Sequence, residues 1–547
     1  MKVLIVGGVA GGAGAAARFR RNDEKAEIIL FEKSGYISFA NCGLPYYIGD
    51  VITDRSDLFI QTPESFRTRF NVDVRVNSEV VSVDAAGRKV TVKDLINGGS
   101  YEENYDALVL SPGAKPVRPP FPGIEKGHVF TLRNIEDTFK IKDFISVYRP
   151  KSGAIIGGGF IGLEMADNFH SLGMEVGIIE ASSHVIATLD GDMAHDLHNH
   201  IRSKGVKLHL NSKLTEIGDG FVITDKGDRI DAELVIVSVG VRPETGFLQG
   251  SGVRLGSRGE IVVNEYLETS AAGVYAVGDA IAVKDFVSGK EVLVPLASPA
   301  NKQARIVADN ISGRKAPYKG TQGTAIAKVF DMTAAMTGQS EAALKAAGTP
   351  YKKIYTYSMS NAGYYPGGEP MFIKLLFRPD DGKVLGAQIT GSKGVDKRID
   401  QFAAALRYNG TVYDLEELEL AYAPPFSSAK DPVNMAGYAA ENILTGKSDV
   451  FYLEDLPDIP KDAILLDVRT AGEFKRGSID GAVNIPLDTL RENLERLDRS
   501  KEIYEYCQVG LRGYYAEQIL KHNGFKVKNL SGGYRFYNVM QKDKGQK

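Results

Sequence analysis

Short apolar runs that end in glycine-rich turns give the first predicted elements of the chain. Residues 3–6 form a β-prone run, and glycines separate this run from an alanine-rich stretch that predicts a helix, after which a second apolar run ends on Glu32. Gly7 and Gly12 permit a tight turn and close helix packing, so the pattern predicts a βαβ unit that binds a dinucleotide pyrophosphate at the helix N-terminus. Val9 stands where the middle glycine of this fingerprint is usual. A glycine-rich turn without a ligand is therefore the alternative for this unit.

The same pattern returns in the middle of the chain with a complete fingerprint. The run at 154–156 leads to Gly157, Gly159 and Gly162, and the following apolar run ends on Glu180. A carboxylate in this position accepts hydrogen bonds from a ribose 2′-hydroxyl and repels a 2′-phosphate. The second unit therefore favours NADH over NADPH.

The pattern changes in the second half of the chain. Between about residues 320 and 446 it indicates mixed strands and helices, with a strand at 372–377 and a hairpin turn at 380–383. Residues 446–460 are turn-rich and acidic, which marks a domain boundary. A chain of 547 residues also exceeds what one core usually supports, so we expect three or four domains.

Composition excludes several classes of protein. The formal net charge of -3 gives no general attraction to nucleic acid or to anionic membranes. No run of about twenty apolar residues occurs, so we expect no membrane span, and the N-terminus reads as strand, turn and helix rather than as a signal peptide. Two cysteines in the whole chain form no disulfide framework, which favours a cytoplasmic location. We predict no metal site.

Each cysteine is either an inert core residue or a working nucleophile. Cys42 lies in the segment at 38–46, shortly after the first βαβ unit. Cys507 follows an apolar run and precedes a short glycine-containing loop and a predicted helix. Backbone N–H groups surround a thiol in such a loop and stabilise a thiolate or persulfide anion, and Arg512 adds positive charge at the end of the loop.

The two βαβ units, together with the later segment at 269–280, resemble the pyridine nucleotide-disulfide oxidoreductases over roughly the first four fifths of the chain. In this family the first unit holds FAD and the inserted second unit holds NAD(P)H. The resemblance implies FAD contacts from Gly7, Val9, Ala10, Gly11, Gly12, Glu32, Lys33, Gly113, Gly278 and Asp279. It implies NADH contacts from Gly157, Gly159, Phe160, Ile161, Gly162, Glu180 and Gly240.

Many members of this family carry a second cysteine four residues from the first, and this chain does not. Cys42 must then cycle through a mixed disulfide, a persulfide or a sulfenic acid. Because an ordinary thiol, with a pKa of about 8.5, is only a few per cent thiolate at neutral pH, we expect helix N-terminal amides or flavin contacts to lower the pKa of Cys42. The segment at 38–46 resembles the branch of coenzyme A-disulfide reductases and NADH-dependent persulfide reductases. Single-cysteine NADH peroxidases and oxidases form the rival branch, but they place a histidine where this chain has Ala10.

Two further segments, residues 361–367 and 420–426, also resemble the coenzyme A-linked branch. In that branch tyrosines of the partner subunit reach the catalytic cysteine, which implies a homodimer with shared active sites. Tyr422, with Tyr364 or Tyr365, would then hydrogen-bond the leaving sulfur or the neighbouring carbonyl.

Coenzyme A needs cationic partners for its phosphates. Arg18, Arg20 and Arg21 lie within one turn at the end of the first predicted helix. The family resemblance favours Arg18 and Arg21 as phosphate contacts. It adds Ser38, Asn41 and Gln61 as contacts to the pantetheine arm.

The last part of the chain resembles a single rhodanese domain, because residues 464–486 and the loop that begins at Cys507 carry two motifs in the correct order. We interpret Asp467 and Arg469 as structural residues that hold this loop.

These resemblances imply an α/β fold with two Rossmann-like dinucleotide-binding domains of the glutathione-reductase type, an α+β dimerisation domain and a C-terminal α/β rhodanese domain. The implied boundaries are 1–112 with 244–320 for FAD binding, 113–243 for NAD binding, 321–446 for dimerisation, 447–460 for a linker and 461–547 for the rhodanese domain.

The sequence therefore predicts an FAD-dependent NADH oxidoreductase that reduces coenzyme A persulfide, polysulfide or coenzyme A disulfide at Cys42, while Cys507 handles sulfane sulfur. The first alternative is an NADH oxidase or peroxidase that works through a Cys42 sulfenic acid. The second is a redox sensor or sulfur carrier with a vestigial flavin site. The preferred sulfur substrate and the direction of sulfur flow between Cys507 and Cys42 stay open.

Overall fold

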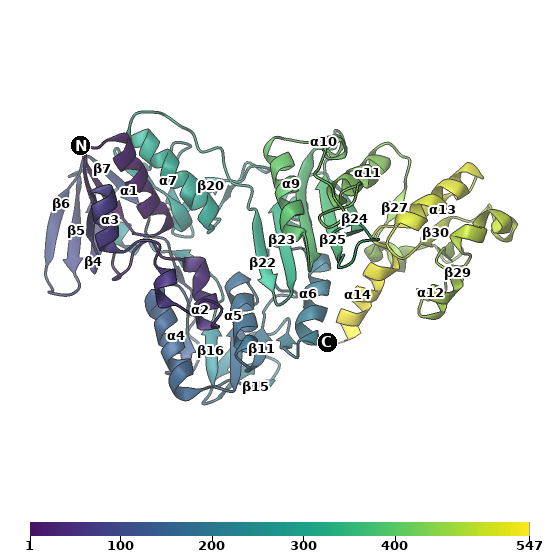
Figure 1. Ribbon diagram of the computed structural model, residues 1–547, viewed down its shortest axis with the longest axis horizontal. Helices are drawn as coiled ribbons and strands as arrows, with labels where there is room; N and C mark the ends of the chain where they lie inside the picture. Colours follow the sequence, from purple (N-terminus) through teal and green to yellow (C-terminus); the bar gives the residue numbers. More distant parts are fainter. Residues whose placement is uncertain (546–547) are drawn as a thin grey trace. The chain divides into compact units, whose positions relative to one another are not determined.

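The computed structural model describes residues 1–545, so the last two residues of the expected rhodanese segment lie outside it. The chain divides into two compact units, shown in Figure 1. The first unit comprises residues 1–182 and 205–323, and the second comprises residues 183–204 together with the chain from 324 onward.

The first unit contains a parallel sheet with the order β19-β7-β1-β2-β3. Its strands are β1 (Lys2–Val6), β2 (Glu27–Phe31), β3 (Asp73–Arg75), β7 (Ala107–Leu110) and β19 (Val274–Ala276). Helix α1 (Ala10–Asn22) crosses from β1 to β2, since its alanines favour helix and leave a flat surface on which α7 (Ala297–Ile311) packs. The predicted first βαβ unit is thus present.

A second parallel sheet of the same unit has the order β12-β11-β10-β16-β9. Its strands are β9 (Val129–Phe130), β10 (Ser152–Ile156), β11 (Glu175–Ile179), β12 (Lys207–His209) and β16 (Leu234–Val237). Helix α5 (Phe160–Ser171) crosses from β10 to β11, which gives the predicted second βαβ unit. All five residues of β10 are buried, as expected for a central parallel strand.

The other elements of the first unit surround these two sheets. They are helices α2 (Leu44–Ile48), α3 (Pro63–Phe70) and α4 (Ile135–Tyr148), 3-10 turns η1 (Asn41–Gly43), η2 (Arg55–Leu58), η3 (Gly246–Leu248) and η4 (Gly278–Ala280), and strands β4 (Ser78–Asp84), β5 (Lys89–Asp94), β6 (Ser100–Asn104), β8 (Ala114–Pro116), β13 (Leu214–Ile217), β14 (Phe221–Thr224), β15 (Arg229–Asp231), β17 (Val241–Pro243), β18 (Ile261–Val262), β20 (Ile281–Lys284) and β21 (Glu291–Val292).

The main sheet of the second unit has the strand order β22-β23-β26-β25-β24, and all of its neighbouring strands are antiparallel. The strands are β22 (Ala325–Val329), β23 (Met332–Gly338), β24 (Lys352–Met359), β25 (Pro370–Phe377) and β26 (Val384–Gly391). The predicted strand at 372–377 lies within β25, and the predicted turn at 380–383 joins β25 to β26. Helices α8 (Glu341–Ala347), α9 (Val395–Arg407), α10 (Val412–Glu417) and α11 (Pro432–Leu444) complete this part.

The second unit also contains a parallel sheet with the order β27-β31-β30-β28-β29. Its strands are β27 (Val450–Phe451), β28 (Ile464–Asp467), β29 (Val483–Asn484), β30 (Ile503–Tyr506) and β31 (Val527–Leu530). The other elements are α12 (Ala471–Lys475), α13 (Leu511–His522), α14 (Gly533–Gly545) and the 3-10 segments η5 (Leu453–Asp458) and η6 (Leu487–Arg496).

Helix α6 (Gly191–Ser203) follows β11 in the chain but packs within the second unit, against β23, β26 and α14 (Figure 1). The fully buried ammonium of Lys374 holds the start of this helix through ion pairs with Asp190 at 3.0 Å and Asp192 at 2.7 Å, and it also pairs with Glu341 at 2.6 Å. Burial alone would lower the pKa of Lys374, but the three carboxylates raise it. Residues 183–204 of the expected NAD-binding segment therefore belong to the second unit by their contacts.

Among the described residues, no helix combines the length and the apolar character that crossing a membrane requires.

Candidate functional site

The two glycine-rich turns of the first unit have the same geometry. Gly7 and Gly157 adopt φ of +96° and +107°, which side chains other than glycine rarely adopt. A Cβ atom on Gly12 would lie 1.8 Å from the Gly7 carbonyl oxygen, and one on Gly162 would lie 2.0 Å from the Gly157 carbonyl oxygen. Both turns therefore need glycine for the reason that the sequence predicts.

The acids that follow β2 and β11, Glu32 and Glu180, have the same hydrogen-bond pattern. Glu32 accepts hydrogen bonds from the N–H groups of Gly8 at 2.8 Å and Ser34 at 2.9 Å. Glu180 accepts from the N–H groups of Gly158 and Ser182, both at 2.7 Å. Each carboxylate thus lies directly beside its glycine turn, where a ribose hydroxyl is expected.

Gly159 shows that the second turn leaves room for a ligand. Its φ is -79°, which any residue can adopt, and a Cβ atom there would meet no protein atom within 4 Å. The protein itself therefore does not require glycine at this position, whereas a pyrophosphate close to the backbone does. Phe160 and Ile161 form the start of α5 beside it. These residues fit NADH.

The expected FAD residues lie at the carboxyl ends of the first sheet and in the loops after them. Gly278 and Asp279 begin η4, where the Gly278 N–H donates to Gln303 at 2.8 Å and Asp279 pairs with Arg133 at 2.9 Å. Sequence reasoning missed Arg133 because 146 residues separate it from Asp279. The first turn, Glu32 and this later loop fit FAD.

The remaining expected cofactor residues are spread around these turns. Val9 caps α1, Ala10 begins it, and a Cβ atom on Gly11 would lie 2.5 Å from Ser111 Oγ. Lys33 is exposed and pairs with Glu244 at 2.6 Å. Gly113 and Gly240 have φ of +71° and +113° and lie in the connections to β8 and β17.

Cys42 lies in η1 with its side chain exposed. Desolvation by the surrounding protein raises the pKa of its thiol, and the carboxylates of Glu164 and Asp279 raise it further, whereas Arg133 lowers it. The expected lowering of the Cys42 pKa is therefore not supplied by the protein groups around the thiol. A like-charge environment of this kind opposes the thiolate.

Tyr46 and Glu164 form a hydrogen-bonded pair beside this thiol, with the Tyr46 hydroxyl 3.4 Å from Glu164 Oε1. Burial raises the pKa of Glu164 to about 7 and, with the nearby carboxylates, raises the pKa of Tyr46 to about 12. A carboxyl group that titrates near neutral pH can accept or return a proton next to a reacting sulfur. Sequence reasoning missed Glu164, although it follows the last fingerprint glycine by two residues.

The expected pantetheine contacts lie in the segments 38–41 and 60–61, which are hydrogen-bonded to each other. The Ser38 carbonyl oxygen accepts hydrogen bonds from the N–H groups of Ile60 at 3.0 Å and Gln61 at 3.3 Å. Asn41 is the residue before Cys42 and begins η1. Ser38 and Gln61 are thus neighbours in the fold, and Asn41 is next to Cys42 in the chain.

The three arginines at the end of α1 have different environments. Arg20 is buried and donates to the carbonyl oxygens of Phe70, Asp23, Glu24 and Asn71, so it holds the fold. Arg18 pairs with Asp309 at 2.8 Å, and Arg21 is exposed. The cluster predicted from spacing is therefore divided, and Arg20 is unsuited to bind a phosphate.

The expected tyrosines lie on the second unit and are exposed. The Tyr364 and Tyr422 hydroxyls are 2.6 Å apart, and the two side chains are 76% and 46% exposed. Tyr365 is 42% exposed and has its N–H bonded to the Ala362 carbonyl oxygen. Tyr364 is thus the one of the two tyrosines that is hydrogen-bonded to Tyr422.

Arg398 of α9 holds the two loops that carry these tyrosines. Its buried guanidinium donates to the Ser360 carbonyl oxygen at 3.1 Å on one loop, and to Ser427 Oγ and Asp431 Oδ2, each at 3.0 Å, on the other. Charge-assisted hydrogen bonds of this kind are strong when buried and fully paired. Arg398 therefore fixes the spacing of the Tyr364–Tyr422 pair.

Cys507 lies at the end of β30 and is fully buried. The Gly510 N–H donates to its sulfur at 3.1 Å. Burial and Glu505 raise the pKa of Cys507, while the amides of Val509, Gly510 and Gly513 lower it. The predicted amide nest is present, and Gly510 reaches it with a φ of +102°.

Two ion pairs surround the Cys507 loop. Arg512 pairs with Glu473 at 2.6 Å, so its charge is shared with that acid. Arg469 pairs with Asp467 at 2.6 Å and donates to the Gln508 side chain at 3.3 Å, and both members of this pair are buried. These contacts agree with a structural role for Asp467 and Arg469.

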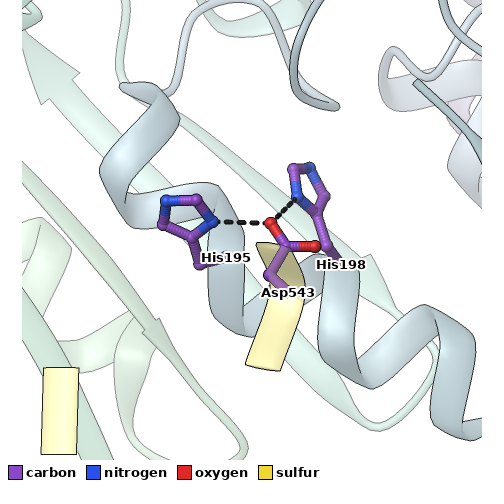
Figure 2. A group of neighbouring side chains, drawn as sticks. All are labelled: His195, His198 and Asp543. Carbon is purple, nitrogen blue, oxygen red and sulfur yellow. Dashed lines mark hydrogen bonds and ion pairs between the residues drawn. The ribbon is translucent and has the colours of Figure 1, made fainter. Parts of the chain in front are cut away.

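One group of described residues has the composition of a metal site: His195 and His198 of α6 and Asp543 of α14 (Figure 2). Asp543 Oδ2 lies 2.6 Å from His195 Nδ1 and 2.9 Å from His198 Nδ1, and Arg202 binds the other carboxylate oxygen. The Val185 N–H donates to His198 Nε2 at 3.2 Å. A neutral imidazole that accepts at Nε2 carries its proton on Nδ1 and has no lone pair there for a metal. We therefore interpret the group as a hydrogen-bonded anchor for α14.

Family models match nearly the whole chain. The model of the pyridine nucleotide-disulphide oxidoreductases matches residues 1–304, that of their dimerisation domain matches 324–432, and that of the rhodanese-like domain matches 452–538. The chain belongs to the pyridine nucleotide-disulphide oxidoreductases, whose cofactors are FAD and NAD(H), and it carries a rhodanese-like domain. The predicted fold class is confirmed.

Particular relatives narrow the class. The coenzyme A disulfide reductase of Staphylococcus haemolyticus is 36% identical over 443 residues, which cover 81% of this chain and 100% of that protein. The structure of reduced Bacillus anthracis CoADR-RHD matches with a TM-score of 0.97 and 48% identity over 98% of each chain. That of a NAD-dependent persulfide reductase from A. fulgidus matches with a TM-score of 0.92 and 37% identity, covering 98% of this chain and 100% of the other. The predicted branch is confirmed, and these comparisons favour it over the NADH oxidase alternative.

Proposed function

We propose that the protein is an FAD-dependent NADH oxidoreductase that cleaves the sulfur–sulfur bond of coenzyme A persulfide, polysulfide or coenzyme A disulfide at Cys42. The observation that carries this proposal is the exposed Cys42, which lies in the chain after the first nucleotide turn and before the second. The same chain also holds a rhodanese-like domain with Cys507. Cys42 lacks the second cysteine four residues away that would form the internal disulfide of many relatives, so we infer that its partner sulfur comes from the substrate.

The cofactors would lie on the two glycine turns. FAD would contact the turn from Gly7 to Gly12, Glu32, Gly278 and Asp279, and NADH would contact the turn from Gly157 to Gly162 and Glu180. Bound NADH and FAD supply the two electrons that return oxidised Cys42 to the thiol. Glu180 favours NADH because a carboxylate repels the 2′-phosphate of NADPH.

Cys42 would carry out the thiol chemistry, with Glu164 as its proton acceptor. The Cys42 thiolate attacks one sulfur of the substrate, the sulfur–sulfur bond breaks, and coenzyme A leaves as a thiolate that takes up a proton. Cys42 is then a mixed disulfide or a persulfide, and two electrons and a proton release the second thiol or hydrogen sulfide. Glu164 lies beside Cys42 and can hold the proton that the thiol loses.

The Tyr364–Tyr422 pair would serve the Cys42 of the partner subunit in a homodimer. An exposed pair of hydroxyls joined by a hydrogen bond can donate one proton to a leaving thiolate while the second hydroxyl steadies the first. The matched dimerisation domain supports this arrangement. Sedimentation analysis should give twice the mass of the chain, and a stable monomer with full activity would exclude shared sites.

Coenzyme A would bind with its pantetheine arm beside Ser38, Asn41 and Gln61 and with its phosphates near Arg18 and Arg21. Arg21 is exposed, and Arg18 is held in place by Asp309. Reduced thiols and this substrate class favour a cytoplasmic location.

Cys507 would accept or deliver sulfane sulfur, with coenzyme A carrying sulfur between the two cysteines on its long arm. Covalent fusion raises the effective concentration of one site near the other. Cys507→Ser should retain coenzyme A-disulfide reduction and slow the turnover of polysulfide. Equal activity of variant and wild type on every sulfur donor would exclude the relay.

The experiment that tests the main proposal is anaerobic oxidation of NADH by the FAD-loaded protein, with coenzyme A persulfide, coenzyme A disulfide or peroxide offered separately. Wild type should turn over the coenzyme A compounds, and Cys42→Ser should lose this activity. Turnover with peroxide alone would contradict the proposal and support the peroxidase alternative.

A further inference from the structure

Glu505 is a buried acid directly below the Cys507 loop. It lies on β30 two residues before Cys507, and Gly513 of α13 approaches both residues. The residue is 0% exposed. Among the described residues, its two carboxyl oxygens and Asn529 Oδ1 belong to the small group of buried side-chain atoms without a hydrogen-bond partner.

Glu505 and Asn529 face the same point in the fold. A Cβ atom on Gly513 would lie 2.3 Å from Asn529 Oδ1 and 2.9 Å from Glu505 Oε1, so this glycine lets both side chains reach beneath the first turn of α13. Two acceptor oxygens that meet in a buried place repel each other unless one carries a proton. A protonated Glu505 could donate to Asn529 Oδ1 and satisfy both groups.

Asn529 connects this acid to the reactive sulfur. Its side-chain NH₂ donates to the Gly510 carbonyl oxygen at 3.1 Å, which fixes the orientation of the amide because a flipped Asn529 would turn Oδ1 toward that carbonyl. The Gly510 N–H donates to Cys507 Sγ at 3.1 Å. Glu505, Asn529 and Gly510 therefore form a path to Cys507.

The charges around Glu505 oppose its ionisation. Glu517 of α13 and Asp467 of β28 both raise its pKa, after the larger effect of burial. Their cationic partners, Lys521 at 2.9 Å from Glu517 and Arg469 at 2.6 Å from Asp467, are already paired with these acids.

The donors around Cys507, in contrast, favour a negative charge on sulfur. The amides of Val509, Gly510 and Gly513 all act on the thiol, and Arg512 lies close enough for its pKa to respond to Cys507. Donors are therefore in place for a negative charge on the sulfur, whereas the Glu505 oxygens have no hydrogen-bond donor within the described part of the chain to stabilise one.

We propose that Glu505 is a positioning residue that stays protonated while Cys507 carries the charge, and that it holds the Gly510 amide on the sulfur by donating a hydrogen bond to Asn529. This rests on the proposed role of Cys507 in sulfur handling. A neutral acid here keeps a second negative charge away from the Cys507 thiolate or persulfide.

The test uses the full-length FAD-loaded protein with Cys42→Ser, so that Cys507 is the only thiol. Ultraviolet absorbance against the Cys42→Ser/Cys507→Ser protein follows thiolate formation with pH. Glu505→Gln keeps a neutral donor, so the Cys507 pKa should equal or fall below that of the parent. Glu505→Leu leaves Asn529 unpaired and should raise the Cys507 pKa by about one unit or more and slow sulfur transfer about tenfold.

Infrared difference spectra between the parent and Glu505→Gln give an independent readout, and the parent should show the carbonyl band of a protonated carboxylic acid. Absence of that band at neutral pH would overturn the proposal, as would a Glu505→Gln protein that behaves like Glu505→Leu, or a Glu505→Leu protein that titrates like the parent. Each Glu505 variant is also made with Cys42 intact, where unchanged coenzyme A-disulfide reduction confirms that the variant folds. The thiolate titrations do not depend on sulfur transfer between Cys507 and Cys42. A negative result in the Cys507→Ser activity test would therefore leave the role of Glu505 testable on its own.

Discussion

Cys42 and Cys507 both have raised pKa values, but the two sites differ in how they can form an anion. Cys507 is buried and has three backbone amides of its own loop directed at the sulfur. Cys42 is exposed, two acids oppose its ionisation, and the cation that favours it, Arg133, is paired with one of those acids. The amides near Cys507 in the chain therefore stabilise an anion on its sulfur, whereas we expect Cys42 to depend on bound FAD and on the proposed tyrosine pair of the partner subunit.

The largest effect on Cys42 chemistry is expected when the hydroxyls of Tyr364 and Tyr422 are removed. Tyr422→Phe should lower the rate of coenzyme A-disulfide reduction by about 10²-fold, because general acid catalysis typically contributes 10²–10⁴-fold. Tyr364→Phe should have a similar effect, and the double variant should lose little more, since the two hydroxyls act as one donor. Steady-state kinetics on the three variants measure these changes. Tyr413→Phe, at an exposed tyrosine of the same unit, is the control. Full activity in the double variant would show that Cys42 needs no hydroxyl donor.

Arg398 should affect Cys42 chemistry through the tyrosine loops alone. Arg398→Leu leaves buried Asp431 with only the more distant ammonium of Lys397, 3.8 Å away, which costs about 3–5 kcal/mol of stability and should slow coenzyme A-disulfide reduction about tenfold. Combining it with Asp431→Asn removes the buried charge while an amide oxygen still caps α11, which should restore much of the stability but not the rate. Urea unfolding and NADH oxidation measure the two quantities separately. Recovery of both together would mean that Arg398 is merely structural.

Replacing Glu164 should have a smaller, pH-dependent effect on the stability of the protein and on the reactivity of Cys42. Its pKa of about 7 lies above the usual value of a glutamate, so its contribution to stability is complete below about pH 4.5 and is lost as the pH rises through 7. Glu164→Gln should make the protein relatively more stable above pH 7 and should increase Cys42 alkylation there by about threefold, because the carboxylate no longer opposes the thiolate. Thermal unfolding and iodoacetamide alkylation in a Cys507→Ser background measure both effects. Parallel pH profiles for the variant and its parent would exclude Glu164 as the neighbouring titrating group.

The smallest effect on Cys42 is expected from the anchor of α14. The Tyr534 N–H at the start of this helix donates to the Cys507 carbonyl oxygen at 2.8 Å, and Asp543 holds its other end. Burial alone would raise the pKa of Asp543, but its histidine and arginine partners lower it overall, so this stabilisation is present at neutral pH and is lost on strong acidification. Asp543→Asn should cost about 1–3 kcal/mol and disturb Cys507 while Cys42 activity stays unchanged. Lys542→Gln, on the exposed neighbour, should change nothing. Hydrogen exchange of the Cys507 loop measures the outcome, and unchanged protection in Asp543→Asn would mean that the anchor does not support the loop.

Local patterns were sufficient to predict the two nucleotide turns and the amide nest. The positive φ at Gly7 and Gly157 and the close approach at Gly12 and Gly162 follow from residue spacing, because turn and helix are continuous in the chain. The nest around Cys507 also arises from consecutive residues. Such geometry is visible in sequence because no distant partner is needed.

Features that depend on distant residues were not predictable. Arg18 and Arg20 are two positions apart on α1 and so face different surroundings, one toward Asp309 and the other into buried carbonyl groups. The Arg133–Asp279 pair, the packing of α6 in the second unit and the approach of Asn529 to Glu505 all join segments far apart in the chain. The effect of Glu164 on Cys42 was also not foreseen, because its carboxylate reaches the thiol from a helix more than a hundred residues away in the chain.

Peptide mapping by mass spectrometry after anaerobic mixing of the reduced protein with coenzyme A disulfide tests the central claim most directly. The account predicts one coenzyme A attached to Cys42 as a mixed disulfide, one equivalent of free coenzyme A, an unmodified Cys507, and loss of the adduct when NADH is added. Release of coenzyme A with no adduct on Cys42, or attachment at Cys507 alone, would contradict it.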